Sequence, residues 1–208
     1  MKTSKTLTQV RITSMLMAIV GFTFLSAAQA DIITFPTEGS EPEISVSQVA
    51  FAGAGCPQDS SRALIIGSKA VLLSHPGFAG SLSEGNLVRK NCSVRIPVAG
   101  VEGYQVALQA QNPGRIDLGE QDKLTVNREL FVAGSTGEVQ SKVFTGKVTQ
   151  RIQIASLAES KLRFSNCGES AILAMNFSAL LRASGRALKD SSFGFDKTRL
   201  NLVVRKCK

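Results

Sequence analysis

The sequence predicts an all-β protein, an antiparallel β-sandwich with two intradomain disulfides. Short runs in which apolar and polar residues alternate recur between clusters of Gly, Pro, Asn and Asp, a pattern typical of β-sandwiches and barrels. A hydrophobic leader opens the chain, and four cysteines, an even number, follow it. In an oxidising compartment an even set of cysteines predicts disulfide bridges.

The first 30 residues have the features of a signal peptide. Three basic residues lie within the first eleven positions, and an apolar run covers residues 15–25. Ala28 and Ala30 occupy the small-residue positions of a signal-peptidase site, so we expect cleavage before Asp31. The apolar run is too short to remain as a membrane-spanning helix. The sequence therefore predicts a secreted protein, extracellular or periplasmic, with no retained transmembrane segment.

The mature chain is long enough for one domain with a sizeable core. Residues 31–43 hold two prolines and four acidic residues, which predicts an extended or disordered lead-in. Residues 44–208 form the single predicted β-sandwich domain. Three of the 24 basic residues and none of the 16 acidic ones lie in the leader, so the mature net charge is +5. This modest, dispersed charge lacks the basic stripe of a nucleic-acid-binding protein, and no nucleic-acid partner is expected.

Four segments alternate apolar and polar residues, as expected of strands with one face in the core. They are residues 92–98, 104–110, 147–157 and 199–205.

Two further segments fit the alternation less well. In residues 122–133, Arg128 falls on the apolar face, which suggests a β-bulge or a charged edge strand. Residues 170–184 are rich in Ala, Leu and Met, and their propensity favours a helix. Their odd positions from Leu173 to Leu181 nevertheless form a continuous apolar strand face, so helix and strand both remain open here.

The cysteines could serve as nucleophiles, as metal ligands or as disulfide halves. A nucleophilic cysteine needs a histidine to activate it, and the only histidine, His75, lies beside Pro76 in a predicted turn. We expect His75 to be a solvated surface residue. The cysteine spacings of 36, 75 and 40 residues do not fit a zinc site. We therefore expect no catalytic residue, no metal and no cofactor, with the four sulfurs in disulfides.

Four cysteines allow three pairings. Proximity along the chain favours Cys56–Cys92 and Cys167–Cys207. The glycines before Cys56 and Pro57 after it favour a tight turn that holds the sulfur toward a neighbouring strand. Cys92 lies on the same face of its predicted strand as the apolar residues, which predicts a buried bridge. Cys207 lies on the face of the polar residues, which predicts a bridge at the rim.

Function is less visible than fold. The acidic residues do not form the carboxylate pair of a glycosidase, and the densest cluster, residues 117–122, fits no calcium loop and is expected to be a solvated turn. We expect a non-enzymatic binding or structural module, monomeric, with an unknown extracellular ligand or surface as partner. A secreted inhibitor or effector, acting through the stiff loop at residues 53–59, is the alternative, and a hydrolase is less favoured.

Three segments are weaker candidates for a binding site. Residues 74–86 form the longest Gly/Ser-rich stretch and the best loop candidate, although a plain connector explains them as well. Residues 192–195, SFGF, are the one place where two aromatic side chains could be exposed. The tripeptides at 91–93 and 176–178 match the N-glycosylation pattern, but both lie in predicted strands, and we interpret them as chance matches.

Five short motifs together resemble a family of small secreted microbial proteins catalogued as domain of unknown function forty-three sixty. The motifs are GAGCPQ (53–58), RKNCSV (89–94), GYQ (103–105), FSNCGES (164–170) and RKC (205–207). The resemblance covers about residues 44–208. It implies an all-β secreted domain with the two bridges favoured above, and a strand over residues 170–184. Many members have a tryptophan where Phe164 stands, and the family has no assigned activity.

Overall fold

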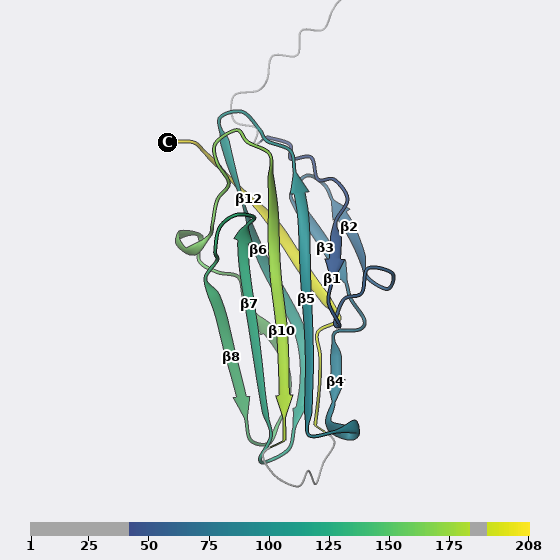
Figure 1. The fold of residues 1–208 in the computed structure, drawn as a ribbon. Helices are drawn as coiled ribbons and strands as arrows, with labels where there is room; N and C mark the ends of the chain where they lie inside the picture. Colours follow the sequence, from purple (N-terminus) through teal and green to yellow (C-terminus); the bar gives the residue numbers. More distant parts are fainter. Residues whose placement is uncertain (1–41, 184–190) are drawn as a thin grey trace, which may run out of the picture. The chain divides into compact units, whose positions relative to one another are not determined.

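Alternating side chains give two antiparallel sheets that pack face to face in the computed structural model of the protein (Figure 1). The structure describes residues 42–183 and 191–208. The predicted signal peptide, the cleavage positions Ala28, Ala30 and Asp31, and the lead-in up to residue 41 lie outside the described residues and stay predictions. The fold class expected from the sequence, an antiparallel sandwich with two disulfides, is confirmed.

The five-stranded sheet lies in front in Figure 1. All of its neighbouring strands run antiparallel. In spatial order the strands are β1 (Ala50–Ala52), β5 (Leu87–Val98), β10 (Ala171–Arg182), β7 (Lys123–Val132) and β8 (Val139–Thr145).

The second sheet packs behind the first and has seven strands. Strand β9 (Val148–Ile154) pairs with its long strand β6. The other strands, in spatial order, are β2 (Arg62–Ile66), β3 (Ala70–Ser74), β12 (Lys197–Lys206), β6 (Tyr104–Leu118), β11 (Ser192–Gly194) and β4 (Ala79–Ser81). Two short 3-10 helices, η1 (Leu82–Glu84) and η2 (Glu159–Lys161), lie in the connections.

The segment that the sequence left between helix and strand is strand β10. It pairs along its length with β5 on one side and with β7 on the other. Its odd-numbered side chains, including Leu173, Met175 and Phe177, are buried between the sheets. Pairing on two sides and burial of one face outweigh the local helix propensity, because tertiary packing routinely overrides such a preference.

An aromatic cluster fills the interior between β10 and the second sheet. Phe78 stacks on Phe177 with ring centroids 4.5 Å apart, and Phe195 meets Phe177 edge-on at 5.3 Å. Phe193 and Phe195 are both buried. The SFGF segment therefore contributes to the core and offers no exposed aromatic surface.

Arg128 lies inside the sandwich, and the expectation of a bulge or a charged edge strand is wrong. Its strand, β7, runs between β10 and β8 in unbroken register, and only 1% of the residue is exposed. Burial lowers the pKa of Arg128 from its ordinary value to about 10, so the side chain stays cationic at neutral pH. The guanidinium donates to the backbone oxygens of Ala110, Ile154 and Ala155 and to the side-chain oxygens of Asn112 and Gln140.

A chain of buried polar groups continues from Arg128 across the core. Arg128 Nη1 donates to Asn112 Oδ1 (2.6 Å), and Asn112 Nδ2 donates to Thr198 Oγ1 (2.6 Å). Thr198 Oγ1 is in turn 2.8 Å from His75 Nε2. Thr198 Oγ1 carries a hydrogen and a second lone pair, so this contact suits either a donating or an accepting Nε2 of His75.

His75 is fully buried, so the expectation of a solvated turn residue is wrong. It begins a break between β3 and β4, where its backbone N–H donates to Asp196 O (2.9 Å) and Phe195 N donates to Phe78 O (2.9 Å). These two bonds continue the sheet across the break. They turn the His75 and Phe78 side chains, which the sequence placed in a loop, into the core.

We predict that Arg128→Met destabilises the fold by about 3–5 kcal/mol, because several buried oxygens lose their donor at once. Urea unfolding measures the loss. Arg151→Met, on the exposed part of β9, is the matched control and should change stability by less than about 0.5 kcal/mol. A loss below about 1 kcal/mol for Arg128→Met would contradict a role for this cation in joining the sheets.

We also predict that stability falls with acidification through His75. Burial lowers the pKa of His75 below its ordinary 6.5, although nearby backbone groups and Asp196 partly oppose this. The unfolded chain then binds the proton more tightly, so this stability is fully present above about pH 6.5 and is lost as the pH falls toward the folded-state pKa.

The test compares urea midpoints at about pH 7.5 and about pH 5. Since His75 is the only histidine, His75→Asn should make the difference between the two midpoints smaller. An equal difference in the variant would show that other groups cause the pH dependence.

Candidate functional site

Six polar side chains cover the outer face of the five-stranded sheet, on the side away from the core. Residues at alternate positions of β5, β10 and β7 point outward together, because side chains alternate between the two faces of a sheet. We call these six residues the polar grid: Asn91, Ser93, Asn127, Glu129, Asn176 and Ser178.

The strand register arranges the polar grid in two rows. Asn176 of β10 lies opposite Ser93 of β5 and opposite Glu129 of β7. Two residues along β10, Ser178 lies opposite Asn91 and Asn127. Each row thus crosses three strands, at an interstrand spacing of about 4.8 Å.

Four of the six residues of the polar grid come from the two N-x-S tripeptides of the sequence. The antiparallel register pairs Asn91 with Ser178 and Ser93 with Asn176, so each asparagine faces the serine of the other tripeptide. Sequence reasoning missed this arrangement. The two matching tripeptides were the available signal, but only the register between β5 and β10 reveals that they lie together.

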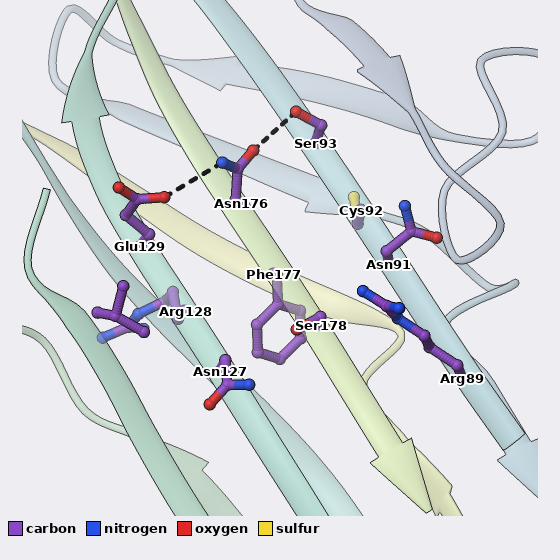
Figure 2. Close-up of a pocket in the computed structure, with 11 residues that line it drawn as sticks. Arg89, Asn91, Cys92, Ser93, Asn127, Arg128, Glu129, Asn176, Phe177 and Ser178 are labelled. Atoms are coloured by element: carbon purple, nitrogen blue, oxygen red, sulfur yellow. Dashed lines mark hydrogen bonds between the residues drawn. The ribbon is translucent and has the colours of Figure 1, made fainter. Parts of the chain in front are cut away.

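The first row, Ser93, Asn176 and Glu129, is held by a directed chain of hydrogen bonds (Figure 2). Arg95 Nη1 donates to Ser93 Oγ (2.8 Å), and Ser93 Oγ donates to Asn176 Oδ1 (2.9 Å). Asn176 Nδ2 donates to Glu129 Oε2 (3.3 Å), and Gly137 N donates to Glu129 Oε1 (3.1 Å). The three side-chain bonds all point from the cation toward the carboxylate, so they polarise one another. We call these three residues the locked row.

The second row, Asn91, Ser178 and Asn127, is different, and we call it the open row. Asn91 Oδ1 accepts from Ala54 N (3.3 Å), which leaves its N–H groups available. Ser178 and Asn127 make no side-chain hydrogen bond with another described residue. The open row therefore presents amide and hydroxyl groups that can both donate to a ligand and accept from it.

A shallow pocket of about 280 Å³ lies over the polar grid. Arg89 borders it on β5, and Val139 borders it on β8. Glu129 is the one carboxylate among the described residues that line it. Figure 2 shows the grid side chains on three adjacent strands, with Arg89 beside Asn91.

The Cys56–Cys92 disulfide supports the polar grid from beneath. Both cysteines are buried, as the parity of Cys92 predicts. Gly55 N donates to Asn91 O (2.8 Å), and a Cβ on Gly55 would stand 2.3 Å from a ring carbon of Phe78. The glycine next to the cysteine is therefore needed for close packing against β5 and the aromatic cluster.

The second disulfide lies far from the polar grid along the strands. It joins Cys167, in the segment before β10, to Cys207, just after β12. Cys167 is exposed and Cys207 is partly buried, which agrees with the expected rim position. Beside it, the guanidinium of Arg205 stacks on Phe164 at 3.6 Å from the ring centroid.

Among the other candidate segments, part of residues 74–86 lines a separate open pocket of about 490 Å³. Residues 74–86 are divided among the end of β3, strand β4 and helix η1, and the expected solvated turn at 117–122 includes a buried carboxylate, Asp122, which accepts from Ser191 Oγ. Within residues 42–183 and 191–208, no three His, Cys, Asp or Glu side chains gather where they could hold a metal ion. None of the helices in the described part of the chain has the length and apolarity to cross a membrane.

Comparison with known proteins identifies the family. The family model described as "Domain of unknown function (DUF4360)" matches residues 42–207, nearly the whole described chain. The protein belongs to this family. The resemblance seen in the sequence motifs is thereby confirmed, while no curated protein matches the chain.

One solved structure similar to this family member is that of TmCBM61 in complex with beta-1,4-galactotriose. The similarity covers 76% of this chain and 90% of that chain, with 13% sequence identity and a TM-score of 0.24. A TM-score this low carries no argument about the ligand of the DUF4360 protein, so the site must be judged on its own geometry.

We predict that the locked row is energetically coupled and the open row is not. In a double-mutant cycle, Ser93→Ala and Asn176→Ala should show a coupling of about 0.5–1.5 kcal/mol in the free energy of unfolding. The matched cycle of Ser178→Ala and Asn127→Ala should show less than about 0.3 kcal/mol, because no bond joins these two side chains. Equal coupling free energies in the two cycles would contradict the distinction between a bonded row and an open row.

Proposed function

We propose that this protein is a secreted binding module without catalytic activity, and that the open row of the polar grid contacts the ligand. One observation carries the proposal: a row whose hydroxyl and amide N–H groups make no hydrogen bond within the described residues lies beside a row whose orientation is fixed. Such an arrangement supplies binding groups on a rigid support, which lowers the entropy lost on binding.

Secretion is supported by the leader and by the sulfur chemistry. The leader has a basic region, an apolar run and a small-residue cleavage site. All four cysteines are paired and none is free, as expected of a protein that folds in an oxidising compartment.

The chemistry of the open row favours a neutral ligand rich in hydroxyl groups, such as a saccharide chain. Asparagine amides and serine hydroxyls both donate and accept, as sugar hydroxyls do. The groups repeat across three adjacent strands, so an extended ligand can bond to several of them at once. Arg89 at the border adds a donor with a fixed positive charge.

The absence of catalysis is supported by the residues that line the pocket. Hydrolysis of a glycosidic bond generally uses two carboxyl groups about 5–9.5 Å apart. The described lining residues supply one carboxylate, Glu129, and both of its oxygens already accept hydrogen bonds in the locked row. The geometry thus suits holding a ligand better than cleaving it.

We predict that the wild-type protein binds neutral oligosaccharides on a glycan array. The double variant Asn127→Ala/Ser178→Ala should lose at least about tenfold in affinity, which is equivalent to about 1.4 kcal/mol of binding free energy. Calorimetry with the best oligosaccharide from the array measures the loss. The matched control, Gln150→Ala/Gln153→Ala on the exposed part of β9, should bind as the wild type does. Unchanged binding by the open-row variant, or substrate turnover that a single substitution abolishes, would refute the proposal.

A further inference from the structure

Strand β2 is an exposed apolar edge of the second sheet. Within the described residues it pairs with β3 alone, and all five of its residues are exposed. Leu64, Ile65 and Ile66 expose 61%, 43% and 52% of their surfaces. Leu72 of β3, which pairs with Leu64, is also exposed. Unpaired backbone groups and apolar side chains thus occur together on one edge.

Edge strands are normally protected against pairing by charges, prolines or bulges. Strand β8, an edge of the first sheet, shows such protection, because Lys142 lies at its centre between the exposed Val139 and Val143. Strand β2 has no proline, no bulge and no central charge, and its one charged residue, Arg62, is its first. The edge of β2 is therefore open to pairing with another strand.

We propose that β2 pairs with β2 of a second copy of this chain, antiparallel across a two-fold axis, so that one continuous sheet runs through both copies. A two-fold axis through a strand edge brings the same surface of each copy together and closes the assembly at two chains. The sequence led us to expect a monomer, because alternation alone does not indicate which strand forms the edge of a sheet.

The charges on the strand are compatible with self-pairing. With the register centred on Leu64, Arg62 of one copy lies opposite Ile66 of the other. The two Arg62 residues then stand about 14 Å apart along the strands, beyond the screening length of about 8 Å at physiological ionic strength. Arg62 Nη1 also donates to the backbone oxygens of Asp59 (2.7 Å) and Ser61 (2.8 Å), which holds its charge beside its own chain.

The apolar side chains on both faces of β2 are complementary in the same register. On the outer face, Leu64 meets Leu64 of the second copy, and Leu72 extends the apolar contact within each chain. On the inner face, Ile65 continues the core beyond Val71, its fully buried neighbour on β3. A five-residue strand buries less than the roughly 1,200 Å² of a standard interface, so the dimer is reversible and concentration-dependent.

A charge-swap experiment on the exported full chain tests this register. Sedimentation velocity of the wild type over about 1–500 μM should show a concentration-dependent dimer. Leu64→Lys and Leu64→Glu should each be monomeric, because the two-fold axis places residue 64 opposite itself and like charges repel. An equimolar mixture of the two variants should restore the dimer. Val143→Lys, the same change on edge strand β8, should leave the wild-type dimer intact.

Thermal unfolding confirms that each variant is folded, which is expected because residue 64 is largely exposed. The proposal is overturned if the wild type remains monomeric over the whole range. It is also overturned if Leu64→Lys leaves a dimer intact, which would indicate another interface. A mixture that stays monomeric would exclude the register centred on Leu64, and with it this two-fold pairing.

Discussion

The sandwich depends on a buried guanidinium whose described partners are carbonyl and amide oxygens, with no carboxylate among them. Arg128 on β7 reaches across the interior to the backbone of β6 and to the end of β9, which joins the two sheets by charge-assisted bonds. A cation in this position is costly to desolvate, so its partners must be held in place by the surrounding strands. The oxygens of Asn112 and Gln140 complete this set.

The side chains of consecutive residues of β7 therefore point to opposite faces of the sheet. Arg128 points into the core and anchors a chain of polar groups that ends at His75, while Asn127 and Glu129 point outward into the polar grid. The inner chain fixes the strand that carries the outer side chains. Packed interiors transmit strain, so the bonds of Arg128 help to hold the strand on which Asn127 and Glu129 lie.

The strands and the sulfur chemistry could be predicted from the sequence because they depend on local pattern. Alternation over a few residues is enough to recognise β5, β6, β9 and β12, and cysteine spacing favours two short loops. Residues 170–184 needed the family resemblance, since propensity and alternation disagreed there. Alternation along the sequence thus identifies the strands, whereas the pairing between them is known only from the structure.

Arg128 and His75 could not be placed in this way. An arginine on the apolar face of a strand normally indicates an edge strand. Arg128 can be buried because the distant Ala110 accepts its hydrogen bond, and His75 because the distant Thr198 contacts its ring nitrogen. The polar grid has the same limitation, because its members come from three strands far apart in the chain. No local signal states which of their side chains are bonded and which remain open.

The pairing of the two N-x-S tripeptides has a practical consequence for how the protein is produced. In a eukaryotic secretory pathway, such a tripeptide is an acceptor for asparagine-linked glycan. A glycan on Asn176 would be attached through the amide nitrogen that donates to Glu129, and a bulky sugar would then occupy the sheet face. Material made in a yeast or insect host could therefore carry a blocked surface on a correctly disulfide-bonded fold, whereas bacterial export would leave it bare.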